Sequence, residues 1–142
     1  MKIILIRAAA ISAATSVALG ALGAHALKDK LSPELLQAFE TGVRYQFYHS
    51  LALLAVALLI DHSISGNSGI SRNSGFLKYS ARLFLLGIVL FSGSLYFLAL
   101  KPLCGIEGLR WIGAVTPLGG LCFIAGWILL AFSFSSASAK QS

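Results

Sequence analysis

Charged residues are scarce in this sequence. Lys, Arg, Asp and Glu together make up 11% of the 142 residues, whereas hydrophobic residues make up 57%. A soluble globular domain carries about 25% charged residues, which keep its surface in water. The scarcity of charge excludes a soluble enzyme, a disordered chain and a nucleic-acid-binding module. It indicates an integral membrane protein, and the length suits a single transmembrane domain, 1–142.

Cysteine and the common catalytic motifs are equally sparse. Of the two cysteines, Cys104 lies in a short connection and Cys122 in an apolar run, a placement that argues against a disulfide framework. The sequence has no CxxC spacing and no G-x-S-x-G, H-E-x-x-H or P-loop motif. We therefore expect no metal, no cofactor and no enzymatic activity.

The net charge of +6 has a topological explanation. The cations stand singly at the ends of apolar runs, as expected for residues at a membrane surface, so the expected partner is the lipid bilayer and not a nucleic acid. Four crossings would place both termini on one side. That side would hold Lys2, Arg7, Arg72, Lys78, Arg82 and Lys140, and the other side Lys28, Lys30, Arg44, Lys101 and Arg110. This small excess of Lys and Arg favours cytoplasmic termini.

Four apolar segments are long enough to cross a membrane, which takes about 20 residues. They cover residues 3–24, 43–60, 79–100 and 116–134. The sequence thus predicts an all-α fold, an integral membrane four-helix bundle. The first segment also resembles a secretory signal, with Ala24-His25-Ala26 as a cleavage site. Because this segment is longer than a usual signal core and carries a stripe of small residues, we expect it to be retained.

The second helix is predicted to begin before its apolar part. Ser32 is a suitable N-cap and Pro33 suits the first helical position. Residues 33–43 have an amphipathic pattern. This lead-in either lies along the membrane interface and bends inward at Gly42, or continues as one long helix. We favour the bend.

Small residues recur along single helix faces, where they let helix backbones approach closely. The residues predicted to pack helices in this way are Gly20 and Gly23 on the first helix, Gly87 and Ser94 on the third, and Gly119 and Gly126 on the fourth. The pattern favours a tight bundle without a wide aqueous pore. In the fourth helix, Thr116 is expected to cap the start and Pro117 to occupy the first turn.

One cluster of polar residues could carry chemistry. It comprises His25 at the end of the first helix and Glu40, Arg44, Tyr45, Tyr48 and His49 on the second. Glu40 and Arg44 have the i,i+4 spacing of an ion pair. The functional interpretation is a pocket for an anionic headgroup, a proton or a metabolite. The structural interpretation, which we favour, is a snorkelling arginine, an interfacial tyrosine belt and histidines that cap carbonyls. Haem ligation by His25 and His49 is a weaker hypothesis.

Several stretches resemble a known family. They are Gly20-Ala21-Leu22-Gly23-Ala24-His25-Ala26-Leu27, the run from Phe39 to His49, Phe91-Ser92-Gly93-Ser94-Leu95-Tyr96, Thr116-Pro117-Leu118-Gly119-Gly120 and Phe123-Ile124-Ala125-Gly126-Trp127. In this order they are similar to the YgdD/YwdK-type proteins, small bacterial inner-membrane proteins of unknown function. The resemblance implies a four-helix membrane fold, retention of the first helix and a plasma-membrane location. It implies no reaction and no substrate.

These observations favour a non-catalytic accessory or scaffold protein of the membrane. Its partners would be a larger membrane protein complex or further copies of the same chain. The alternative is a small transporter or an ion or proton conduit that uses the cluster around His25, Arg44 and His49. A lipid-handling enzyme is the weakest of the three hypotheses, because the sequence offers no acid–base pair and no metal site.

Overall fold

The computed structural model describes residues 2–62, 70–106, 108 and 110–136. It contains four apolar helical rods, each long enough to cross a membrane, so the predicted all-α membrane fold is confirmed. The first rod is α1 (Lys2–Leu22) followed by the π-helical turn η1 (Gly23–Leu27), and the second is α2 (Pro33–His62). The third rod joins α3 (Ser74–Gly87), the π-helical turn η2 (Ile88–Ser92), α4 (Gly93–Leu100) and the 3₁₀ turn η3 (Lys101–Cys104). The fourth joins the 3₁₀ turn η4 (Arg110–Ala114) and α5 (Val115–Phe132).

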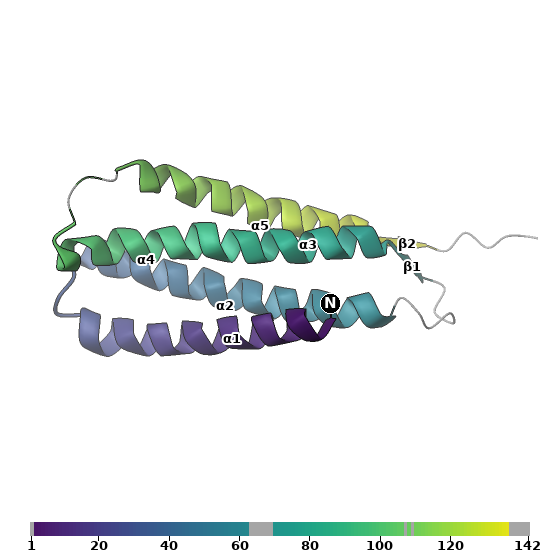
Figure 1. Cartoon of the computed structure of the whole chain (residues 1–142), viewed down its shortest axis with the longest axis horizontal. Coiled ribbons are helices and arrows are strands. Elements are labelled where there is room, and N and C mark those ends of the chain that lie inside the picture. Colours follow the sequence, from purple (N-terminus) through teal and green to yellow (C-terminus); the bar gives the residue numbers. More distant parts are fainter. Residues whose placement is uncertain (1, 63–69, 107, 109, 137–142) are drawn as a thin grey trace, which may run out of the picture.

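The rods pack in the order of the sequence. α1 lies along α2, α2 lies along α3 and α4, and α3 with η2 lies along α5, so that α1 and α5 form the two edges of the bundle (Figure 1). In the most apolar stretches of α1 and α5 only 17% of the residues are buried, against 39% in α2. Lipid tails are as apolar as these side chains. The two edge helices therefore present much of their surface to the bilayer.

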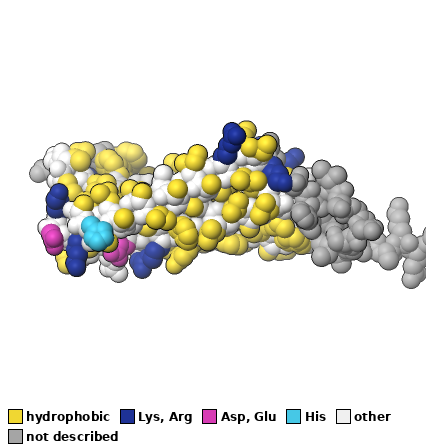
Figure 2. Space-filling model, turned by 90° about the horizontal axis from the view of Figure 1, so that it is seen from below, with side chains coloured by type: hydrophobic (Ala, Val, Ile, Leu, Met, Phe, Trp, Pro, Cys, Tyr) yellow, Lys and Arg dark blue, Asp and Glu magenta, His cyan; other side chains and the backbone are white. Residues whose placement is uncertain are grey.

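Charge is confined largely to the ends of the rods. On the face seen in Figure 2, mostly apolar side chains cover the middle of the molecule, and most of the charged side chains lie nearer its two ends. Lys28 and Lys30 stand exposed at the turn between α1 and α2, whereas Lys78 and Arg82 lie in the first turns of α3. This distribution fits the apolar slab of a membrane between two polar interfaces.

The bend predicted at Gly42 is wrong, because α2 is one continuous helix from Pro33 to His62. Gly42 serves close packing instead. A Cβ atom at this position would lie 2.9 Å from Cε1 of Tyr96, whose ring also packs against Phe39 at a centroid distance of 5.0 Å. The predicted cap at the start of α2 is confirmed, since Ser32 Oγ accepts from the amide of Leu35 at 3.4 Å.

The last two rods begin earlier than the apolar runs suggest. Asn73 caps α3, because its Oδ1 accepts from the amides of Gly75 and Phe76 at 3.0 and 3.2 Å. α5 begins at Val115, and its N-cap residue makes no side-chain hydrogen bond. The Thr116 hydroxyl instead lies 2.7 Å from the Ser94 hydroxyl, so the predicted capping role of Thr116 is wrong.

Two short strands, which the sequence does not predict, join the ends of α3 and α5. β1 (Ile70–Arg72) pairs antiparallel with β2 (Phe134–Ser136). The amide of Asn73 extends the connection by donating to the Ser133 carbonyl at 2.8 Å. This pairing fixes the start of the third rod to the end of the fourth. Lys140, which the sequence assigns to the same side of the membrane, lies outside the described residues.

Candidate functional site

The six residues of the predicted polar cluster are only partly brought together. His25 in η1 and Glu40 on α2 are exposed and line neither of the two hollows described below. Arg44 is exposed, and its Nη2 donates to Thr41 Oγ1 at 3.2 Å. Within the described residues the expected ion pair between Glu40 and Arg44 does not form. The long side chain of Arg44 turns back to Thr41, which lies nearly one helical turn earlier.

The other three members line a groove between α2, η2 and α5. Its volume is about 440 Å³, and its lining residues are Tyr45, Tyr48, His49, Phe91, Gly120, Phe123, Ile124 and Trp127. Most of these side chains are aromatic, and those of Tyr45, Tyr48 and Trp127 are exposed on the surface. The groove is therefore a hollow on the bilayer-facing surface with an aromatic lining.

His49 forms the buried wall of this groove. Its ring stacks on Phe123 with centroids 3.4 Å apart and planes 9° apart. Its Nδ1 lies 2.8 Å from the Tyr45 carbonyl, and its Nε2 lies 3.3 Å from Nε1 of Trp127. An indole N–H can only donate, so Nε2 is the acceptor and the imidazole proton belongs on Nδ1. His49 is thus held as one neutral tautomer.

This arrangement does not support haem ligation by His25 and His49. In this tautomer Nδ1 carries the proton, and the lone pair of Nε2 accepts from Trp127, so His49 could bind iron only by breaking that contact. Within the part of the chain that the structure describes, no group of three His, Cys, Asp or Glu side chains is placed to hold a metal ion.

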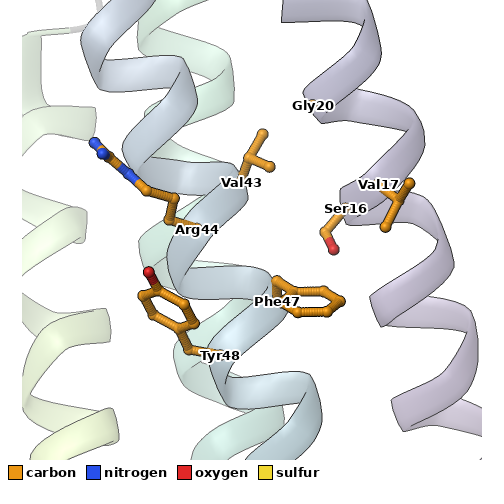
Figure 3. Close-up of a pocket in the computed structure, with 7 residues that line it drawn as sticks. All are labelled: Ser16, Val17, Gly20, Val43, Arg44, Phe47 and Tyr48. Carbon is orange, nitrogen blue, oxygen red and sulfur yellow. The ribbon is translucent and has the colours of Figure 1, made fainter.

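A second hollow lies on the other side of α2, against α1 (Figure 3). It is smaller, about 240 Å³, and is lined by Ser16, Val17, Gly20, Val43, Arg44, Phe47 and Tyr48. In Figure 3, Val43 and Phe47 point toward α1, whereas Arg44 and Tyr48 point to the opposite side of α2. Tyr48 also lines the larger groove, so it stands between the two hollows, whereas Arg44 lines only the smaller one.

A buried polar network, which the sequence alone does not predict, joins α1, α2 and α4. Gln46 Nε2 donates to the Ser12 carbonyl at 2.9 Å and to Thr15 Oγ1 at 2.8 Å, while its Oε1 accepts from the Tyr96 hydroxyl at 2.8 Å. One turn further, Ser50 Oγ lies 2.7 Å from Ser12 Oγ and 2.6 Å from the Gln46 carbonyl. A glutamine and a serine at i,i+4 in an apolar helix are the sequence signal for such a network.

Other buried hydroxyls are also satisfied, with one exception. Ser80 Oγ donates to the Gly126 carbonyl at 2.8 Å and so joins α3 to α5. Ser92 Oγ, in the π-helical turn η2, is the one buried side-chain oxygen or nitrogen without a hydrogen-bond partner among the described residues. The polar groups inside the bundle therefore bond mainly to other groups of the protein. Their hydrogen bonds join neighbouring helices.

The small residues predicted to pack helices lie at helix contacts. A Cβ atom added at each glycine would lie close to a side chain of another helix. The distances are 3.4 Å to Val43 for Gly20, 3.2 Å to Phe39 for Gly23, 2.5 Å to Phe123 for Gly87 and 2.7 Å to Phe84 for Gly126. At Gly119 a Cβ atom would overlap the backbone nitrogen of Phe91. Ser94 bonds to Thr116. The glycines therefore make room for aromatic rings as well as for neighbouring backbones.

Comparison with known proteins places this fold in a family. Residues 19–120 match the family described as "Protein of unknown function (DUF423)". The chain is 42% identical over 133 residues to a UPF0382 membrane protein of Staphylococcus epidermidis, covering 94% of this chain and 95% of that protein. It is 42% identical over 130 residues to the UPF0382 membrane protein YwdK of Bacillus subtilis, with 92% and 94% covered. It is 41% identical over 122 residues to the UPF0382 inner membrane protein YgdD of Escherichia coli, with 86% and 82% covered.

No solved structure matches the chain. The matches to YwdK and YgdD confirm the resemblance found in the sequence, and the names of the relatives agree with an integral membrane protein. Because the family match covers well over half of the chain and the relatives align along most of their length, this chain belongs to the DUF423 family of membrane proteins.

Proposed function

We propose that this protein is a non-catalytic accessory or scaffold protein that associates with other membrane proteins or with further copies of itself. The observation that carries the proposal is the placement of its polar groups. The buried ones bond to each other across helices, as Gln46 does to Thr15 and Tyr96, and so hold the rods together. The apolar surfaces of α1 and α5 remain open at the two edges. Such a molecule acts through its surface.

The alternative, a transporter or an ion or proton conduit, has less support. It needs His25, Arg44 and His49 to act as one polar site. His25 and Arg44 are exposed, whereas His49 is buried and bonded on both sides of its ring. A proton relay through His49 would have to break its contact with Trp127 in each cycle.

The association can be tested by native mass spectrometry of the protein taken from its own membrane in mild detergent. We expect a fixed stoichiometry, either with a second membrane protein or with further copies of this chain. Chemical cross-linking in the intact membrane before extraction is the control for partners that detergent removes. A bare monomer in both experiments would overturn the proposal.

We also propose that both termini face the cytoplasm. The Lys and Arg count of the sequence supports this orientation. The side of the termini holds six, namely Lys2, Arg7, Arg72, Lys78, Arg82 and Lys140, and the other side holds five. By the positive-inside rule, Lys and Arg residues close to the ends of spanning helices favour the cytoplasmic side.

The orientation can be tested with Cys104, which is exposed at the opposite end from the termini. In a Cys122→Ser variant, a membrane-impermeant maleimide should label Cys104 in intact cells, because this end would face outward. The Cys104→Ser variant is the control, since Cys122 lies half-buried within α5. Labelling of Cys104 only after the cells are broken would show the opposite orientation.

A further inference from the structure

Arg44 stands well inside the apolar slab. Val43, its neighbour in sequence, is level with Gly20 of α1. From Gly20 the first rod continues to Lys28, about 12 Å further at 1.5 Å per residue. Arg44 thus lies far closer to the middle of the membrane than the lysines at that end. A cation at such depth is costly unless it is paired or reaches the interface, so its presence calls for a partner.

Within the described residues, the protein bonds few of the hydrogen-bond donors of Arg44. A guanidinium has five N–H donors, and the Arg44 guanidinium makes a hydrogen bond to Thr41 alone among the described residues. Glu40, one helical turn nearer the end of the bundle, is also exposed, and its carboxylate forms no ion pair or hydrogen bond within the described part of the chain. Residues at i and i+4 lie about 6 Å apart on one helix face. The surface therefore offers an inner positive charge and an outer negative charge, and within the described residues neither is held in an ion pair.

The two hollows beside α2 extend this pattern toward the membrane centre. Both lie largely on the inner side of Arg44, because Phe47 and Tyr48 line the smaller one and Tyr48 and His49 line the larger one. Tyr48 lines both hollows and stands between them, and Arg44 lines the smaller one. A phospholipid has two acyl chains on the membrane side of its headgroup. Two hollows on the membrane side of one pair of opposite charges therefore match a two-chain lipid with a zwitterionic headgroup.

We propose that Glu40, Arg44 and the two hollows form a binding site for a phospholipid whose phosphate is followed by an amine. The phosphate, nearer the glycerol, binds the Arg44 guanidinium, which suits the geometry of phosphate oxygens. The ammonium group, further out, binds the Glu40 carboxylate. The acyl chains lie in the two hollows on either side of Tyr48. Phosphatidylethanolamine has this order of charges, whereas phosphatidylglycerol lacks the amine.

The test is native mass spectrometry of the delipidated full chain, titrated with an equimolar mixture of phosphatidylethanolamine and phosphatidylglycerol that carry identical acyl chains. The wild-type protein should bind phosphatidylethanolamine preferentially. Arg44→Gln should weaken the binding of both lipids about tenfold, the effect of losing a charge-assisted hydrogen bond. Glu40→Gln should keep lipid binding but reverse or abolish the preference.

Two further variants make the test specific. Arg7→Gln removes an exposed arginine at the other end of α1 and should leave binding unchanged. Gly120→Leu adds bulk to the larger groove and should weaken the binding of both lipids. A Cβ atom at Gly120 would lie 3.8 Å from the Phe91 ring, so it would not clash with the bundle itself. Equal losses from Arg44→Gln and Arg7→Gln would indicate diffuse attraction and overturn the site. An unchanged lipid preference in Glu40→Gln would overturn the role of the amine.

Discussion

Replacing Gly119 with alanine is expected to destabilise the protein, whereas the same change at Gly120 is not. At Gly119 the new methyl group would overlap the backbone nitrogen of Phe91 and lie 2.8 Å from its Cα, and a backbone cannot rotate away as a side chain can. α5 would have to move away from η2. Overpacking of this kind costs about 1–3 kcal/mol, in spite of the better helix propensity of alanine.

Gly120 provides the matched control, one residue away on the same helix. A methyl group there would meet the Phe91 ring at 3.8 Å, an ordinary contact distance. Gly120→Ala should therefore be neutral or stabilising by up to about 1 kcal/mol, the difference in helix propensity. Thermal unfolding in detergent, followed by tryptophan fluorescence, measures both. Equal unfolding temperatures for the two variants would contradict the close approach of α5 and η2.

Replacing Gln46 with leucine is expected to have the second large effect. The amide makes three hydrogen bonds to other rods: two to α1 and one to Tyr96 of α4. Hydrogen bonds between membrane helices contribute about 0.6 kcal/mol each on average, so the loss should be about 2 kcal/mol. The substitution also leaves the Tyr96 hydroxyl without this partner.

The same substitution at Gln37, which is exposed on the same helix, should change stability little. The double variant Gln46→Leu/Tyr96→Phe should lose less than the two single variants add up to, because the two side chains share one bond. Unfolding in detergent with increasing denaturant measures the stability of the wild type and of the four variants. Additive losses would show that Gln46 and Tyr96 act independently.

The sequence is sufficient to predict the membrane class and the four rods, because apolar length alone decides whether a segment can span a bilayer. It does not predict how the rods contact each other. Gln46 is visibly polar within an apolar run, but only the structure shows that its partners are Thr15 and Tyr96. The pairing of β1 with β2 cannot be predicted for a related reason, since the two strands lie far apart in the sequence and each has only three residues.

The predicted polar cluster shows the same limit. His25 and His49 follow from the sequence as two histidines near one end of the bundle, but their surroundings differ. His25 is exposed in η1, whereas His49 stacks on Phe123 and accepts from Trp127, both on α5. α5 lies far from His49 in the sequence, so the pattern of residues along α2 cannot show which side chains of α5 contact His49. The bend predicted at Gly42 is wrong for the same reason, because this glycine makes room for Tyr96 of another rod, a contact that the sequence of α2 does not show.

The pairing of β1 with β2 has a consequence for the order of assembly during synthesis. The contacts between α1 and α2, including the hydrogen bonds of Gln46 to Ser12 and Thr15, need no later part of the chain and can form as soon as both helices have left the ribosome. The pairing of the two strands needs β2, which follows α5 in the sequence. When the third rod enters the bilayer, β1 at its start is therefore still unpaired. It pairs with β2 only after α5 has been inserted beside the third rod.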